Sequence, residues 1–260
     1  MKPWETIDRA LTPDGTELTL ARRDQEWVVR IGGAMLMSSR MHGSEESLAS
    51  EALTATATKA ERVLIGGMGL GFTLRAVLDR VGPGAIVTVA ELVPAVVMWN
   101  RKHVGALAGN PLSDPRVRIH EGDVRAHMAE SKGTYDAILL DVDNGPRSVE
   151  HDDNEKLYLD EGIRICRAAL RKGGVLATWS VASDGGYVRR LKNAGFRAEA
   201  KSVAARVGAR AQHVIFLAAL SSSKGGVPAP SGKPASSGKP GKPDPSGKPV
   251  TSTSPRRRRP

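Results

Sequence analysis

Several residue types are scarce in this chain, and each scarcity excludes a class of protein. Cys166 is the single cysteine among 260 residues, so no disulfide can form within the chain. Aromatic residues make up 4%, and aliphatic side chains must therefore fill the core. No run of about 18 apolar residues occurs, so we expect no membrane span. The opening MKPWETIDRA lacks an apolar stretch and a cleavage signal, which predicts a cytoplasmic protein.

Positive charge is abundant but unevenly distributed. The formal net charge is +10, and residues 221–260 hold five Lys and four Arg against one Asp, which gives +8. The first 220 residues therefore carry only +2. The terminal segment repeats SGKP and has almost nothing apolar to bury. We predict a disordered basic tail that can contact anionic partners without specificity.

The first 58 residues predict a small β unit with a linking helix. Residues 16–24 and 26–33 alternate or run apolar on either side of a polar turn, and 34–39 can add a third strand. Residues 44–57 predict a helix, with Ser44 as its N-cap and acidic residues near its positive end.

Residues 59–220 alternate between strand patterns and helix patterns. The expected strands are 62–67, 85–92, 116–123, 135–143, 174–181, 196–204 and 211–220. The expected helices are 71–81, 94–104, 124–131, 154–171 and 187–195, the fourth closed by Gly173 and Gly174. This order predicts an α/β, Rossmann-like fold whose mostly parallel seven-stranded sheet has helices on both faces. Ligands of such sheets bind beyond the carboxyl ends of the strands, where the strand order reverses.

A glycine-rich turn, GGMGLG, follows the first expected strand of this region. Gly67, Gly69 and Gly71 give the spacing G-x-G-x-G. The dinucleotide fingerprint G-x-G-x-x-G fails in either register, and the phosphate-binding loop motif is absent, so a pyrophosphate site is disfavoured. The turn predicts close approach of a ligand to the backbone, and the alternative is a packing turn without a ligand.

Two acidic residues end the next two expected strands. A carboxylate at Glu91 can accept hydrogen bonds from both hydroxyls of a ribose, and Asp123 can accept one from an adenine amino group. Taken singly, each is more often a solvated loop residue. Together, after a glycine turn and without a phosphate motif, they predict a nucleoside joined to a cationic group, such as S-adenosylmethionine.

Asp141 and Asp143 end the fourth expected strand and are the candidate catalytic residues. A carboxylate there can orient an amine, accept its proton and tolerate a nearby sulfonium. The alternative is a strand-end turn built by Asn144, Gly145 and Pro146. The histidines have no metal-ligand spacing, so we expect no metal.

Five segments, taken in order, resemble the spermidine synthase (polyamine aminopropyltransferase) family over about residues 16–220. They are VLIGGMGLGFTLRAVL, ELVPAVV, DPRVRIHEGD, YDAILLDVDNGP and CRAALRKGGVLATW. The resemblance implies a small N-terminal β domain before a methyltransferase-like Rossmann domain. It also implies Glu91 on the ribose, Leu92 beside the adenine, Asp123 on its amino group and Asp141 as the acid–base residue. A homodimer is a further expectation from the resemblance.

The chain departs from the family at three places. The family usually reads GGGDGG, and its Asp holds the ammonium of decarboxylated S-adenosylmethionine, whereas Gly69 occupies that position here. Asn144 replaces the second Asp of the family's D-S-x-D-P motif. The stretch MLMSSRMHGSEESLA lacks the Gln and Tyr that the family places near the polyamine.

Three functions remain open from the sequence. The first is methyl transfer from S-adenosylmethionine to a small-molecule acceptor, because Gly69 removes a carboxylate that would repel the carboxylate of that donor. The alternative is aminopropyl transfer from decarboxylated S-adenosylmethionine to an amine. The third is a nucleoside-binding protein without catalysis.

Overall fold

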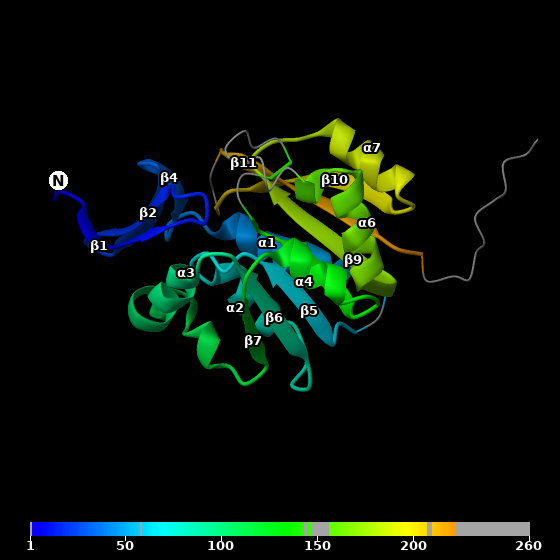
Figure 1. The fold of residues 1–260 in the computed structure, drawn as a ribbon, viewed down its shortest axis with the longest axis horizontal. Coiled ribbons are helices and arrows are strands. Elements are labelled where there is room, and N and C mark those ends of the chain that lie inside the picture. Colours follow the sequence, from blue (N-terminus) through cyan, green and yellow to red (C-terminus); the bar gives the residue numbers. More distant parts are fainter. Residues whose placement is uncertain (1, 58, 143–144, 147–155, 207–209, 222–260) are drawn as a thin grey trace, which may run out of the picture. The chain divides into compact units, whose positions relative to one another are not determined.

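The computed structural model describes residues 2–57, 59–142, 145–146, 156–206 and 210–221 (Figure 1). The predicted basic tail lies outside the described residues, apart from Ser221. The candidate catalytic residue Asp143 lies outside them as well.

The N-terminal sheet is antiparallel, in the order β1-β2-β3-β4. Its strands are β1 (Glu5–Leu11), β2 (Glu17–Arg23), β3 (Glu26–Ile31) and β4 (Ala34–Ser38). Alternation buries Leu18 and Leu20 of β2 on one face, as the pattern predicts. Strand β1 was not expected from the sequence, because ETIDRAL has no clear apolar alternation.

The linking helix α1 spans Gly43–Ala55, and its predicted N-cap is wrong. His42 occupies the N-cap position, and Ser44 lies fully buried in the first turn. The hydroxyl of Ser44 bonds to the Glu45 carboxylate and the His213 ring, so tertiary contacts have displaced its capping role.

The main sheet has seven strands in the order β10-β11-β9-β8-β5-β6-β7. They are β5 (Arg62–Gly66), β6 (Ile86–Glu91), β7 (Val117–Glu121), β8 (Tyr135–Leu140), β9 (Leu170–Ser180), β10 (Arg197–Ala204) and β11 (Gln212–Ala219). The first five are parallel, and β10 and β11 pair antiparallel at one side. This confirms the predicted Rossmann-like fold, and the chain order reverses between β5 and β8.

Helices cover both faces of this sheet because alternate strand residues point to opposite sides. Val63 and Ile65 pack in the cluster that includes α1, α2 (Phe72–Leu78) and α3 (Pro94–Trp99). Leu64 packs on the other face with α4 (Val124–Glu130), α6 (Asp160–Ala169) and α7 (Gly185–Asn193). No helix among the described residues is long and apolar enough to cross a membrane.

The predicted helix end at Gly173 and Gly174 is wrong. Helix α6 ends at Ala169, and β9 begins at Leu170 and runs through both glycines. A side chain at Gly174 would press on the carbonyl oxygens of Arg171 and Asp136. Gly174 therefore allows close strand packing, and Gly173 has φ of +75°, in the region that favours glycine; neither glycine ends a helix.

The predicted α-helix 94–104 is α-helical only in its first part. Helix α3 ends at Trp99, and a π-helical turn follows over Asn100–Val104. That turn places the Asn100 side chain beneath the glycine turn, where its amide nitrogen donates to the carbonyl of Gly69 at 2.8 Å.

Asp136 anchors the amino ends of the central strands. Its Oδ2 accepts from the backbone nitrogens of Glu61 and Arg62 at 2.9 and 2.8 Å, and the Arg171 guanidinium donates to its Oδ1 at 3.1 Å. The residue is 7% exposed. It therefore fixes β5 against β8 and β9, whose opposite ends form the pocket described below.

We expect Asp136→Ala to lower the free energy of unfolding by about 2–4 kcal/mol, because it leaves two partly buried backbone donors and the Arg171 guanidinium without their acceptor. Asp136→Asn should cost less, since its amide oxygen still accepts. Urea unfolding measures both. A loss below about 1 kcal/mol for the alanine variant would contradict this role.

Candidate functional site

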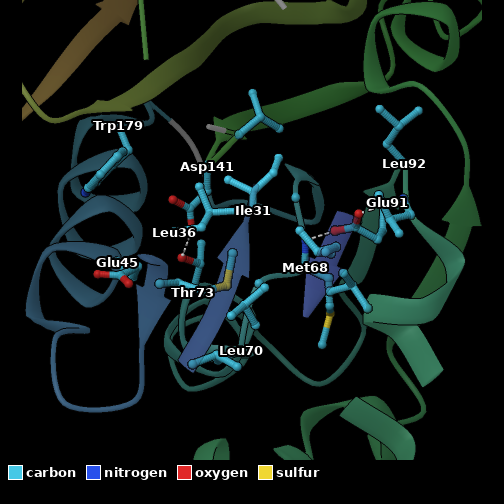
Figure 2. Close-up of a pocket in the computed structure, with 18 of the residues that line it drawn as sticks. Ile31, Leu36, Glu45, Met68, Leu70, Thr73, Glu91, Leu92, Asp141 and Trp179 are labelled. Atoms are coloured by element: carbon cyan, nitrogen blue, oxygen red, sulfur yellow. Dashed lines mark hydrogen bonds between the residues drawn. The ribbon is translucent and has the colours of Figure 1, made fainter. Parts of the chain in front are cut away.

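A pocket of about 1050 Å³ lies at the carboxyl ends of the parallel strands, and the N-terminal sheet supplies one wall. Figure 2 shows Asp141, Thr73, Glu45 and Trp179 on one side of it and Glu91, Leu92 and Met68 on the other. The predicted site residues that line it are Gly67, Gly69, Gly71, Glu91, Leu92, Asp123 and Asp141. The structure therefore brings together every predicted site residue that it describes.

The glycine turn needs glycine for two separate reasons. Gly67, Gly69 and Gly71 have φ of +89°, +48° and +87°, in the left-handed region that other residues rarely adopt. A side-chain carbon at Gly67 would also overlap the backbone carbonyl oxygen of Asp141. The same addition at Gly69 would meet only the Met37 sulfur, at 3.6 Å.

Glu91 ends β6 and is nearly buried, at 8% exposure. Its Oε2 accepts from the backbone N–H of Met68 and its Oε1 from that of Val93, both at 2.8 Å. The carboxylate thus ties the glycine turn to the start of α3. Leu92 next to it is 44% exposed and lies on the pocket wall.

Asp123 ends the loop after β7 and caps α4. Its Oδ1 accepts from the backbone N–H of Arg125 at 2.8 Å, and the side chain remains exposed at the pocket. The cap fixes the carboxylate at the end of the pocket that Glu91 also lines.

Asp141 follows β8 and receives a hydrogen bond of 2.5 Å from the Thr73 hydroxyl of α2. Its backbone N–H donates to the carbonyl of Gly66 at 2.9 Å, which continues the strand pairing to the turn. Burial raises the pKa of the Asp141 carboxyl from 3.8 to about 6, and the Thr73 hydrogen bond opposes that rise. Asp141 is thus a stronger base than an ordinary aspartate.

Glu45, Trp179 and His213 are among the pocket residues that the sequence did not predict. Glu45 reads as a helix-start acid, Trp179 as a core residue and His213 as an isolated histidine on a closing strand. No local motif marks them, because their place in the site depends on contacts far apart in the chain. Within the described ranges, no three His, Cys, Asp or Glu residues gather closely enough to hold a metal ion.

Comparison with known families and curated proteins gives one consistent result. Residues 41–184 match the spermine/spermidine synthase domain. A polyamine aminopropyltransferase of Korarchaeum cryptofilum is 33% identical over 131 residues, which cover 50% of this chain and 38% of that protein. One from Prochlorococcus marinus is 35% identical over 138 residues, covering 52% and 45% respectively. The chain thus spans less than half the length of these two relatives.

Solved structures show the same fold. A spermidine synthase in complex with the transition-state analogue AdoDATO has a TM-score of 0.68 and 21% identity, over 82% of this chain and 73% of that one. Spermidine synthase from Thermotoga maritima has a TM-score of 0.66 and 21% identity, over 82% and 72%. At this identity the likeness concerns the fold alone.

The glycine turn generates a stability prediction. Gly67→Ala should lower the free energy of unfolding by about 3 kcal/mol, because left-handed strain and overlap with the Asp141 carbonyl add together. Gly69→Ala should cost about 1 kcal/mol, from strain alone. Gly84→Ala, in open space, is the matched control. Urea unfolding measures all three, and equal losses at 67 and 69 would contradict the proposed contact.

Asp141→Asn should stabilise the free protein at pH 8. A carboxyl whose pKa rises from 3.8 unfolded to about 6 folded favours folding below pH 4 and loses that contribution as the pH rises through 6. Asparagine has no charge to desolvate and can still accept from Thr73. We expect a gain of about 1–2 kcal/mol at pH 8 that shrinks towards pH 4. Urea unfolding across that range would contradict the burial argument if the gain were independent of pH.

Proposed function

This chain belongs to the spermine/spermidine synthase domain family, and on that premise we propose that it transfers an aminopropyl group from decarboxylated S-adenosylmethionine to an acceptor amine. The observation that carries the proposal is that Glu91 and Asp141 line one pocket within the segment matched to the family. The chain matches only part of its curated relatives, so the donor, the acceptor and the activity are our proposal.

The Glu91 side of the pocket suits the adenosyl group of the donor. A carboxylate has about four acceptor sites, so Glu91 can bond two backbone amides and also accept from ribose hydroxyls. Leu92 offers an apolar surface beside a base, and Asp123 an acceptor for its amino group. The pocket volume exceeds that of a typical single small-ligand site, which leaves space for a second substrate.

Asp141 suits the reacting end. The donor supplies a carbon bonded to positive sulfur; the acceptor nitrogen bonds to this carbon while the C–S bond breaks and its electron pair stays on sulfur. Asp141 orients the acceptor and takes its proton, which the raised pKa of the carboxyl assists. Thr73 is a positioning residue, because the hydrogen bond from its hydroxyl fixes the Asp141 carboxylate. The walls formed by Leu36 and Met37 help to exclude water.

Aminopropyl transfer is favoured over the methyl transfer that the sequence alone predicted first. The matched relatives are polyamine aminopropyltransferases, and the matched family domain, residues 41–184, contains the glycine turn, Glu91 and Asp141 of this pocket. The preference for methyl transfer rested on one missing carboxylate, at Gly69. A single position weighs less than the matched domain.

Methyl transfer from intact S-adenosylmethionine stays as the second candidate because of that position. Gly69 lies against Met37, so this part of the pocket has a thioether where the family has an acid. An apolar lining neither attracts the ammonium of the aminopropyl group nor repels the carboxylate of the intact donor.

One assay separates the candidates, because the two reactions leave different products. The purified chain is given 1,4-diaminobutane with each donor in turn: aminopropyl transfer releases methylthioadenosine, and methyl transfer releases S-adenosylhomocysteine. We expect methylthioadenosine from the decarboxylated donor. Release of S-adenosylhomocysteine alone would favour methyl transfer, and calorimetry showing that a donor binds without being turned over would favour the non-catalytic alternative.

Gly69→Asp should raise the ratio of kcat/KM for the decarboxylated donor over that for the intact donor about tenfold, since a partly buried charge pair is worth about 1–2 kcal/mol. Aspartate tolerates φ of +48°, and the added carbon would make an ordinary contact with Met37. Gly69→Asn is the control of equal shape without charge. An equal change in both variants would contradict the charge argument.

A further inference from the structure

Glu45 brings a second carboxyl to the Asp141 side of the pocket. It comes from the first turn of α1 and lines the cavity with Asp141 (Figure 2). Burial raises the pKa of Glu45 to about 8, and the negative charge of Asp141 adds to the rise. The charge of one carboxyl therefore affects the other across the pocket, and protonation of Asp141 favours ionisation of Glu45.

Glu45 is also the end of a chain of hydrogen bonds. The Ser44 hydroxyl, which is fully buried, lies 2.7 Å from Oε2 of Glu45. Nδ1 of His213 lies 2.9 Å from the same hydroxyl oxygen. The His213 ring packs edge-on against the Trp179 ring, with 4.7 Å between the ring centroids. His213 is only half-buried, so its ring can exchange protons with water.

We propose that Glu45, Ser44 and His213 form a proton relay that clears the proton taken from the acceptor at Asp141. This inference rests on the proposed function, and it assigns to these three side chains a role that the aspartate alone does not fill. Asp141 is the catalytic residue, and the other three act through it.

The relay conserves protons, and its hydrogen bonds can run in either of two directions. With Glu45 protonated, Glu45 donates to Ser44 Oγ, Ser44 donates to Nδ1 of His213, and the neutral ring carries its proton on Nε2. The Glu45 proton then moves to Ser44 Oγ, the Ser44 proton moves to Nδ1, and the imidazole releases its Nε2 proton to water. This leaves Glu45 ionised, with Nδ1–H donating to Ser44 and Ser44 donating to Glu45. Glu45 next takes the proton from Asp141, and the half-buried ring returns to the Nε2–H tautomer by exchange with water. Burial lowers the pKa of His213, which favours release of the Nε2 proton.

The other charged groups near Glu45 do not compete for this role. Glu46 points to His42, whose Nδ1 lies 2.8 Å from its carboxylate. Lys156 lines the pocket from the segment before α6, as an exposed side chain whose positive charge favours an ionised carboxylate. Glu46 therefore provides a matched control, because it has the same chemistry one residue away and lies outside the pocket lining.

The kinetic test compares Ser44→Ala, Glu45→Gln and His213→Gln with the controls Glu46→Gln and His103→Gln, using the decarboxylated donor and 1,4-diaminobutane. We expect kcat to fall about 10- to 100-fold in the three relay variants, at the lower end of general acid–base effects. The apparent affinity for methylthioadenosine should not change. The controls should keep wild-type kcat, and unchanged kcat in Ser44→Ala would overturn the relay.

A second measurement needs no activity. Nitrogen NMR of His213 in the free protein should show that its neutral ring changes tautomer as the pH rises through about 8, from Nε2–H to Nδ1–H, because Glu45 loses its proton there. Ser44→Ala and Glu45→Gln should abolish this change, and Glu46→Gln should keep it. A single tautomer throughout in the wild type would overturn the relay.

The two measurements separate this proposal from the proposed function. A tautomer change in a protein that turns over neither donor would leave the proton path intact and remove the transferase proposal. Turnover with a fixed tautomer would do the reverse.

Discussion

The site depends on one backbone contact, between Gly67 and the carbonyl of Asp141. Strands β5 and β8 are neighbours, and the chain after β5 must turn across the end of β8 before it enters α2. Only a residue without a side chain allows that approach. The contact sets the distance between the glycine turn and the buried carboxylate. Through the bond from Met68 to Glu91 it also sets the position of the second acid. Both ends of the pocket therefore depend on this one close approach of the turn after β5 to the end of β8.

The electrostatics of the pocket oppose stability and suit the proton transfer of the proposed function. Asp141 and Glu45 are both held where water is scarce, and the negative charge of Asp141 raises the cost of ionising Glu45. A cation bound between the two carboxylates would remove that electrostatic cost. The free protein is therefore less stable than a complex with a positively charged ligand. The raised pKa values of the two carboxyls lie close to neutral pH. A base with such a pKa can both take and release a proton.

Much of the architecture could be predicted from local pattern. The buried strands read as apolar runs and the glycines mark the turn, so the fold and the two acids at the strand ends follow from the sequence. The sequence-based predictions were wrong where a residue type suits two different structural roles. Gly173 and Gly174 could end a helix or permit a tight strand, and Ser44 could cap a helix or bond a distant histidine. Glu45 and His213 escaped prediction because their meeting depends on how α1 packs against β11, which no nearby residue signals.

The bond between Ser44 and His213 joins residues 169 positions apart. During synthesis, the early helix emerges long before its partner strand, so the pocket remains incomplete until β11 has left the ribosome and paired with β9. Until then the buried hydroxyl and the carboxyl beside it are open to water. The growing polypeptide can thus form most of its sheet while still lacking a finished pocket.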